Sequence, residues 1–346
     1  MLEHLARMAP GTPLREAFER ILRGRTGALV VLGRTREVAD LSTGGFELDV
    51  PFSPTALREL AKMDGAILLE ADTDRIVRAG VHLTPEASIA TVETGTRHRT
   101  ADRVARQTGV PVVSVSASMA TITLYVDGHR HTVERSADIL SRADQALQTM
   151  ERYRTRLSQV IRRLSALEVE DQVTVRDLAL VTQRLEMIRR LDLELADYVV
   201  ELGTYGRLLN LQLGELAAGT SELPALLELD YRPAETTEPF GIAGLEPLST
   251  AELLEPQAVA RAMGFGPSEH LDTKITVRGY RQLAQINRLP PSFGGRLIEH
   301  FGSLQAMFGA STADLQEVDG VGESRARIIR DGLTRLAETA YAERVD

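Results

Sequence analysis

The spacing of apolar residues changes once along this chain of 346 residues, near residue 136, and that change limits the folds open to it. Before this point, apolar runs of strand length alternate with helical stretches, and after it only helical spacing occurs. Strands interleaved with helices bury a sheet between helical layers. We therefore predict an α/β N-terminal domain with a mixed central sheet flanked by helices. We expect strands over 28–32, 66–69, 76–79, 110–115 and 122–126, and helices over 13–22, 55–63 and 100–108.

Long helices with one broad apolar face are predicted after the sheet-forming part, which is typical of a helical bundle or spine. Apolar residues keep helical spacing over 140–164 and again over 178–199. Thr174 with Asp177 matches a capping box at the start of the second helix, and Gly203 ends that helix. The middle of the chain is therefore expected to be an all-α spine.

A shorter helix is expected over 208–216, and residues 230–255 then hold several prolines and glycines among polar residues. Such a composition indicates a linker or an irregular connection. The chain after it again has helical spacing, in short pieces separated by glycine turns. These features predict three domains, over residues 1–136, 137–255 and 256–346.

Composition excludes several classes of protein. Cysteine is absent, which rules out disulfides, thiolate zinc sites and iron–sulfur clusters. Tryptophan is absent and aromatic residues make up 4%, which argues against stacking platforms for single-stranded nucleic acid. The N-terminus carries charges of both signs, and no apolar run approaches ~20 residues, so we expect neither a signal peptide nor a membrane span. A cytoplasmic location fits these features.

Residues 95–100 read GTRHRT, directly before the helix expected over 100–108. A helix N-terminus supplies free N–H groups and a partial positive charge, and arginine supplies forked hydrogen bonds for phosphate oxygens. The segment therefore suits a polyanion. A random arginine-rich hexamer is more often a solvated loop with an ordinary N-cap, so this interpretation depends on its context. The candidate binding residues are Thr96, Arg97, His98, Arg99 and Thr100.

That context is Asp64 and Gly65, which directly precede the strand expected over 66–69. An aspartate at such an edge can hold Mg²⁺ beside nucleotide phosphates, and a glycine allows close backbone approach. Residues 80–83 (GVHL) could line a pocket for a base. Alone, an Asp-Gly pair is usually just a turn. The sequence has no P-loop, GxGxxG or HExxH motif, which removes the commonest nucleotide and zinc sites.

The C-terminal part differs from the rest in charge. The chain as a whole carries a net charge of −9, which taken alone argues against nucleic-acid binding. Residues 278–335, however, hold eight arginines against six acidic residues. An average over the chain therefore conceals a net-positive segment.

Within that segment, residues 318–326 read VDGVGESRA, a pattern that predicts a tight hairpin between two helices. Backbone N–H groups of such a hairpin can point at a DNA phosphate. The alternative is a glycine C-cap followed by an unremarkable helix. Residues 289–304 look like a second, degenerate hairpin, and two hairpins favour DNA binding. The candidate contacts are Gly320, Gly322, Ser324, Arg325 and Arg327.

Several motifs together resemble those of the DisA family of bacterial DNA integrity scanning proteins, which are diadenylate cyclases. The resemblance covers nearly the full length, and the paired DGA and RHR motifs at this separation are highly specific to diadenylate cyclase domains. The motifs are MDGAILL (63–69), GVHLTP (80–85), ETGTRHRTADRVARQTG (93–109), SVS with ITLYV (114–126), FGSLQAM (301–307) and VDGVGESRARIIRDGL (318–333).

The resemblance implies an activity and an assembly. The activity is condensation of two ATP molecules to cyclic di-3′,5′-AMP (c-di-AMP) with release of two pyrophosphates, supported by Mg²⁺ or Mn²⁺. The implied assembly is a homo-octamer with a helical spine and a C-terminal helix-hairpin-helix domain that binds DNA. Branched DNA, such as a Holliday junction, is expected to lower synthesis, and the contacts with DNA are expected to be independent of sequence.

The resemblance also implies roles for single residues. Asp64 would bind the metal and lie beside the reacting 3′-hydroxyl; whether it also acts as general base stays open. Gly65, Leu83 and Ser116 would contact the nucleotide, and residues 96–100 would hold the phosphates. The expected catalytic set is Asp64, Arg97, His98 and Arg99. Some relatives carry an arginine run after the serine, where this chain has Ala117, Ser118 and Met119, so those extra phosphate contacts are not expected here.

Two other functions compete with an enzyme regulated by DNA. One is a non-catalytic DNA-binding protein whose N-terminal domain senses a cyclic dinucleotide. The other is a DNA repair scaffold that uses only the hairpins. The intact metal carboxylate favours catalysis over sensing, because a receptor would not need it. A scaffold would leave the N-terminal motifs unexplained.

Overall fold

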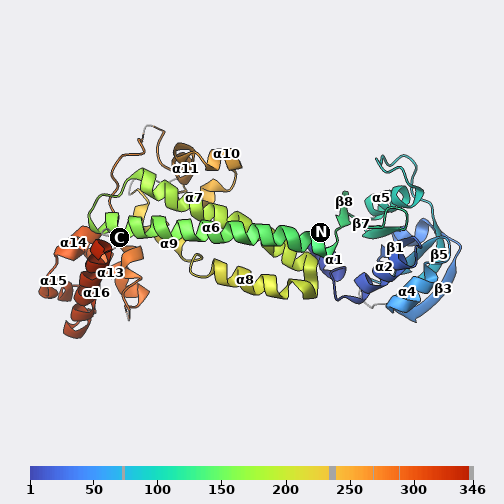
Figure 1. Ribbon diagram of the computed structural model, residues 1–346, viewed down its shortest axis with the longest axis horizontal. Helices are drawn as coiled ribbons and strands as arrows, with labels where there is room; N and C mark the ends of the chain where they lie inside the picture. The colour runs from blue at the N-terminus through green and yellow to red at the C-terminus, as the bar shows by residue number, and fades with distance from the viewer. Residues whose placement is uncertain (72–74, 234–238, 268, 288, 343–346) are drawn as a thin grey trace. The chain divides into compact units, whose positions relative to one another are not determined.

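The protein forms two compact units in a computed structural model that describes residues 1–71, 75–233, 239–267, 269–287 and 289–342. The first unit comprises residues 1–145 and 194–212, and the second comprises residues 146–193 and 213–346. Two long helices, α6 (Ser136–Val169) and α7 (Val175–Leu202), contribute residues to both units (Figure 1). The division into three domains stays a prediction.

The first unit is built on one mixed sheet, as predicted. In the described part of the chain, eight strands lie in the order β2-β5-β4-β1-β6-β7-β8, and β3 also pairs with β5. β1 and β4 are parallel, and every other pairing is antiparallel. The strands are β1 (Ala28–Leu32), β2 (Ser42–Thr43), β3 (Phe46–Pro51), β4 (Ala66–Leu69), β5 (Arg75–Leu83), β6 (Val112–Ser116), β7 (Thr121–Val126) and β8 (His129–Val133).

Helices cover both faces of this sheet (Figure 1). Val30 of β1 packs with Phe18 of α2 in one apolar cluster, whereas Val31 packs with Val104 of α5 in the other. Successive side chains of a strand point to opposite faces, so the continuous apolar run of β1 serves two cores at once. The helices are α1 (Leu2–Arg7), α2 (Pro13–Arg23), α3 (Arg36–Asp40), α4 (Pro54–Leu60) and α5 (Thr96–Thr108).

One helix begins earlier than predicted. α5 starts at Thr96, not at residue 100, and Gly95 is its N-cap without a side-chain capping hydrogen bond. The GTRHRT segment is therefore the first turn of the helix and not a loop before it. Because no side-chain cap occupies this end, its backbone N–H groups remain available to another acceptor.

The helical part follows the prediction closely at the start of α7. Thr174 and Asp177 form the expected capping box, with backbone N–H to side-chain oxygen distances of 3.1 Å and 3.4 Å. The helix ends at Leu202, and Gly203 follows with a φ of 52°. Two further helices follow, α8 (Arg207–Ala217), which was expected, and α9 (Leu223–Tyr231), which was not.

The segment expected to be an irregular connection contains short helices, and residues 234–238 of it lie outside the described residues. The described remainder holds a 3₁₀ turn η2 (Ile242–Leu245) and the helix α10 (Thr250–Leu253). The chain then continues through α11 (Pro256–Met263), α12 (Tyr280–Leu283), α13 (Pro291–Phe301), α14 (Leu304–Gly309), α15 (Thr312–Gln316) and α16 (Glu323–Ala342). Among the described residues, no helix is both long and apolar enough to cross a membrane.

A buried polar cluster within the second unit fastens α12 to the ends of α6 and α9. The carboxylate of Glu168 pairs with the guanidinium of Arg281 and accepts a hydrogen bond from the Tyr231 hydroxyl at 2.5 Å. Asp230 accepts the backbone N–H groups of residues 279–281 at 2.6–2.9 Å. Each of these four side chains is at most 4% exposed, so the charges are satisfied inside the protein.

Candidate active site

Three sequence motifs meet in one cavity of about 150 Å³ in the first unit. β4 and β5 pair antiparallel with Ala66 opposite Val81, which brings the residues before β4 beside the end of β5. The first turn of α5 closes the third side. Six predicted residues, Asp64, Gly65, Leu83, Thr96, Arg97 and Thr100, line the cavity together with Leu29, Ala66, Val81 and His82.

Gly65 can only be glycine in this arrangement. Its φ is 106°, and a Cβ atom there would lie 2.6 Å from the carbonyl carbon of Gly80 and 2.9 Å from the amide nitrogen of Val81. The backbone just before β4 therefore approaches the backbone of β5 more closely than any side chain at this position permits. Next to it, Asp64 is exposed at the cavity, and its carboxylate makes no ion pair within the part of the chain that the structure describes. It is free to bind a cation.

The guanidinium of Arg97, a residue that lines the cavity, lies against a glycine that sequence reasoning missed. A Cβ atom at Gly27 would lie 2.3 Å from Nη1 and 3.0 Å from Cζ of Arg97, so the guanidinium occupies space that any side chain at position 27 would fill. A glycine before a buried strand is common, and nothing in the sequence marks this one. Together with the uncapped N-terminus of α5, Arg97 makes this side of the cavity suited to anions.

Three predicted site residues, His98, Arg99 and Ser116, do not line the cavity. His98 is 6% exposed, and its Nδ1 atom lies 2.8 Å from the hydroxyl of Tyr125. Exposed Arg99 donates from Nη2 to the carbonyl of Thr94 at 3.0 Å. Because the motif is helical, consecutive side chains point about 100° apart, so Arg97 and its neighbours cannot all face one ligand.

Ser116 ends β6 and leads into the turn of residues 117–119. Its Oγ accepts a hydrogen bond from the backbone N–H of Met119 at 3.3 Å and lies 3.3 Å from the Oγ of Ser118. The serine hydroxyl is therefore engaged within its own turn.

Burial lowers the pKa of His98, opposed by the nearby negative charge of Glu93. The imidazole is thus neutral at neutral pH and adds no positive charge beside Arg97. The sequence motif suggested that the histidine binds the polyanion together with the two arginines, but in the helix the His98 side chain is buried.

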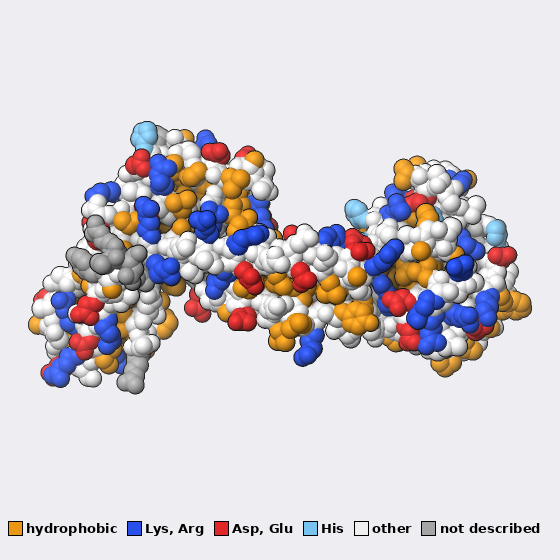
Figure 2. Space-filling view, viewed as in Figure 1, with side chains coloured by type: hydrophobic (Ala, Val, Ile, Leu, Met, Phe, Trp, Pro, Cys, Tyr) orange, Lys and Arg blue, Asp and Glu red, His pale blue; other side chains and the backbone are white. Residues whose placement is uncertain are grey.

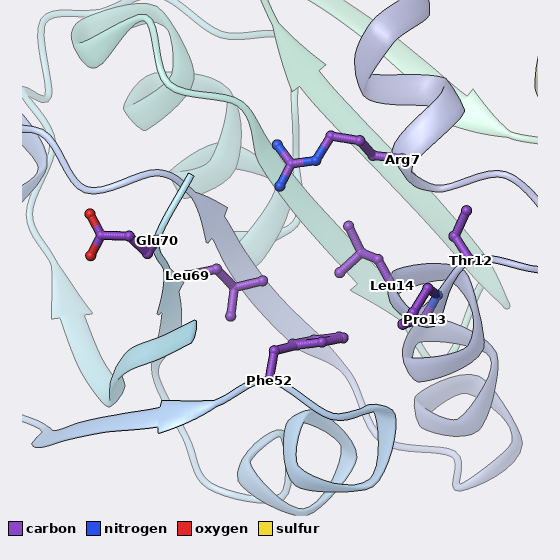
Figure 3. Close-up of a pocket in the computed structure, with 7 residues that line it drawn as sticks. All are labelled: Arg7, Thr12, Pro13, Leu14, Phe52, Leu69 and Glu70. Carbon is purple, nitrogen blue, oxygen red and sulfur yellow. The ribbon is translucent and has the colours of Figure 1, made fainter. Parts of the chain in front are cut away.

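A second cavity, of about 310 Å³, lies at the other end of β4 from Asp64 (Figure 3). Its lining is mainly apolar, with Arg7 and Glu70 as the charged members. None of the predicted site residues lines it. The remaining lining residues are Thr12, Pro13, Leu14, Phe52 and Leu69.

In the second unit, two arginines contact the aromatic ring of Phe293 and also bind the loop before α16. The guanidinium carbons of Arg325 and Arg296 lie 4.1 Å and 4.9 Å from the ring centroid of Phe293. Arg325 donates to the carbonyl of Gly320 at 2.6 Å, and Arg296 donates to that of Asp319 at 3.0 Å. The cation–π contact of Arg325 thus joins α16 to α13, and the two arginines hold the loop through hydrogen bonds to its carbonyl groups.

The predicted DNA contacts differ in how free they are. Gly320 has a φ of 78°, and a Cβ atom there would lie 2.8 Å from Nη1 of Arg296. Gly322 has open space around it, Ser324 is exposed, and Arg327 pairs with Glu323. On the face drawn in Figure 2, basic and acidic side chains are interspersed over the α13–α16 region. A phosphate would therefore bind to the backbone of this loop and not to a broad basic surface.

The sequence is similar to known proteins along almost its whole length. Residues 15–130 match the family model described as DisA bacterial checkpoint controller nucleotide-binding, and residues 133–271 match the DisA bacterial checkpoint controller linker region. DNA integrity scanning protein DisA of Streptomyces coelicolor is 57% identical over 99% of this chain and 94% of its own length. The protein of that name from Frankia alni is 56% identical over 98% and 96%. Among solved structures, a double mutant of DacA from Staphylococcus aureus aligns with a TM-score of 0.31 at 24% identity, over 38% of this chain and 88% of that chain.

Proposed function

The chain belongs to the DisA family of bacterial DNA integrity scanning proteins, and from this membership we infer that it is a diadenylate cyclase coupled to DNA scanning. The observation that supports this most strongly is the cavity that Asp64, Arg97 and the uncapped first turn of α5 line together. A carboxylate and an anion-binding helix terminus in one cavity suit a nucleoside triphosphate with its metal ion.

In the proposed reaction, each 3′-oxygen attacks the α-phosphorus of the other ATP, and pyrophosphate leaves in line. Two phosphodiester bonds form, two phosphoanhydride bonds break, and the product is c-di-AMP. Asp64 is proposed to lie beside the attacking 3′-hydroxyl, while Arg97 and the α5 backbone N–H groups neutralise phosphate charge. Gly65, Leu83, Thr96 and Thr100 shape the nucleotide site. Positioning and charge neutralisation supply most of the catalysis in such transfers.

Three residues of the predicted site do not line the cavity, and we propose roles for them as well. Arg99 and Ser116 are proposed to reach the nucleotide once it is bound, since both lie at the exposed surface near the cavity motifs. His98 is buried, and we propose that it contributes to the site indirectly, through the position of α5. One cavity per chain holds one ATP, so two chains must face each other, in keeping with a proposed homo-octamer.

Diadenylate cyclases require a divalent metal ion. The residues at the cavity fit an ion that is bound jointly by the protein and by the phosphates of the substrate. Among the described residues, no three side chains of histidine, cysteine, aspartate or glutamate gather at one place. Mg²⁺ is usually bound by one or two carboxylates together with phosphate oxygens and water. Asp64 fits that mode, and we propose Mg²⁺ or Mn²⁺ as the ion. When bound, the ion offsets the charge of the phosphates.

DNA is proposed to bind at the loop before α16. Gly320 and Gly322 would let phosphates approach the backbone N–H groups, with Ser324, Arg325 and Arg327 at its side. Such contacts read no bases, so binding is expected to be independent of sequence and to weaken steeply with salt. Branched DNA, such as a Holliday junction, is proposed to lower synthesis. We propose a cytoplasmic location, because ATP and DNA are both found in the bacterial cytoplasm.

The test is synthesis by the purified chain with ATP and Mg²⁺ or Mn²⁺, with products separated by chromatography. Asp64→Asn should abolish c-di-AMP formation while the fold is retained, because the change removes the anionic ligand at almost constant volume. Circular dichroism provides the control for folding. Turnover equal to wild type in this variant would remove Asp64 from the mechanism. A wild-type chain that binds c-di-AMP but makes none would show a receptor instead.

A further inference from the structure

Tyr125 of β7 lies directly beneath the anion-binding turn of α5. Its hydroxyl is 2.8 Å from Nδ1 of His98, and the two rings meet edge to face, with centroids 6.2 Å apart and planes at 64°. Tyr125 is 1% exposed and His98 is 6% exposed. The contact is therefore shielded from water, and Nδ1 of His98 depends on the Tyr125 hydroxyl for its hydrogen bond.

A carboxylate stands on the other side of the tyrosine. Burial, followed by a hydrogen bond to Glu93 and the charge of that carboxylate, raises the pKa of Tyr125. Glu93 is in turn paired with Arg130, with Oε1 3.2 Å from Nε. A carboxylate paired with arginine accepts hydrogen bonds and donates none. The negative charge of Glu93 attracts the Tyr125 hydroxyl proton, and we infer that the hydroxyl presents a lone pair to His98.

This arrangement fixes the proton on the histidine. Facing a lone pair, Nδ1 must carry hydrogen, and the ring is neutral because burial lowers the pKa of His98. Nε2 is then an acceptor, and it is buried without a hydrogen-bond partner among the described residues. The Cδ2 atom next to it lies 3.5 Å from the position of a Cβ atom at Gly95, so this edge of the ring supports the N-cap of α5.

We propose that Tyr125 is a positioning residue for nucleotide binding: oriented by Glu93, it holds His98 as the neutral Nδ1–H tautomer and thereby fixes the first turn of α5 at the cavity. The side chain of Arg97 and the free N–H groups of this turn depend on that placement. Tyr125 itself touches no substrate. The kinetic part of the proposal rests on the proposed cyclase function, whereas the state of His98 does not.

The tautomer is measurable without any activity. Magic-angle-spinning NMR of the sedimented full-length chain, with ¹⁵N-labelled histidine and His98→Gln for assignment, distinguishes a protonated from an unprotonated Nδ1. We expect protonated Nδ1 in the wild type and a changed signal in Tyr125→Phe, which keeps the ring and removes the hydroxyl. Protonated Nε2 in the wild type, or an unchanged His98 signal in Tyr125→Phe, would overturn the proposal.

The kinetic consequence is a split between KM and kcat. Tyr125→Phe should raise the KM for ATP about tenfold and change kcat much less, because one buried hydrogen bond that orders the binding turn is lost. Glu93→Gln retains an acceptor for the tyrosine proton and should give a smaller increase than Glu93→Ala. Equal effects of the two changes at Glu93 would contradict the assigned direction of the hydrogen bonds.

Thr123 offers a matched control. It lies two residues before Tyr125 on the same strand, is fully buried, and its hydroxyl has no partner in the described part of the chain. Thr123→Val should leave the KM for ATP and the His98 signal unchanged; a tenfold higher KM would show a general sensitivity of β7. If the wild type makes no c-di-AMP but shows the expected tautomer, the proposed function fails and the assignment of His98 stands.

Discussion

The guanidinium of Arg97 takes its present position because residue 27 has no side chain. The φ of Gly27 is not positive, so alanine fits its backbone, but the new methyl group would displace the guanidinium, the flexible end of Arg97. We expect Gly27→Ala to keep the fold and to raise the KM for ATP at least about tenfold, the cost of weakening a charge-assisted contact. Steady-state kinetics measures this.

The control for that prediction is a double-mutant cycle. In an Arg97→Ala background, Gly27→Ala should add little, because the guanidinium that it displaces is already gone. Additive effects of the two changes would mean that Gly27 acts through some other contact, such as the carbonyl of Val115 at 3.0 Å.

Single residues also show where sequence reasoning stops. The meeting of Asp64, Gly65 and Arg97 was predictable from the resemblance, which assigns their motifs to one nucleotide site. The contact of Gly27 with Arg97 was not, since its two members lie 70 positions apart and neither belongs to a pattern with the other. Tyr125 looked like one apolar residue of a strand, and only the fold places its hydroxyl beside His98.

At the scale of elements, the continuous apolar runs were the safest predictions. β1 and β4 have the predicted bounds, because both their faces are buried and every residue is apolar. β3 and β8 were missed, because an exposed strand with few buried side chains has no apolar pattern to detect. α5 was expected four residues too late, because Gly95 caps it without a side-chain hydrogen bond.

The loop before α16 is held by two arginines that both contact the ring of Phe293. Phe293→Ala removes the surface on which two guanidinium groups stack, each contact being worth roughly 0.5–1 kcal/mol at an exposed site. We expect affinity for a four-way DNA junction to fall about tenfold in a gel-shift assay. Phe293→Tyr keeps an aromatic ring and should bind like the wild type.

Cyclase activity without DNA should be the same in both Phe293 variants and the wild type, since this residue belongs to the second unit. Unaltered junction affinity in Phe293→Ala would place DNA elsewhere on the protein. The same assay would then direct attention to other arginines of the net-positive segment.

At the scale of the whole molecule, the buried cluster makes stability depend on pH. Burial, and then the charge of Glu168, raises the pKa of Asp230 from 3.8 to about 6, against three backbone N–H groups that lower it. The folded protein therefore binds this proton more tightly than the unfolded chain. The free energy of unfolding should fall as the pH rises between about 4 and 6, by up to about 3 kcal/mol, and this contribution is fully present only below pH 4.

Asp230→Asn cannot titrate, so it provides the comparison. Relative to this variant, the wild type should gain about 1.4 kcal/mol of unfolding free energy when the pH is lowered from 7 to 5. Urea titration followed by circular dichroism at the two pH values measures the difference. A difference that is constant, or that changes in the opposite direction, would show that Asp230 is already ionised in the folded protein at pH 5.

The proposed reaction requires two chains, because each chain binds only one of the two ATP molecules. When inactive Asp64→Asn chains are mixed with wild type and subunits exchange, activity per wild-type chain should fall, because mixed pairs hold one incompetent site. Mass spectrometry of differently labelled chains verifies exchange. Activity strictly proportional to the wild-type amount, with exchange shown, would mean that each chain completes the reaction alone.

The close approach of two backbone segments at Gly65 has a genetic consequence. Every single-base change of a glycine codon that alters the amino acid, other than to a stop, introduces at least a Cβ atom. At Gly65 that atom would strike the backbone of Gly80 and Val81, next to the carboxylate proposed to bind the metal. Missense alleles recovered in a selection against the activity should therefore accumulate at this codon, and suppressors should be rare, because main-chain atoms cannot be mutated away.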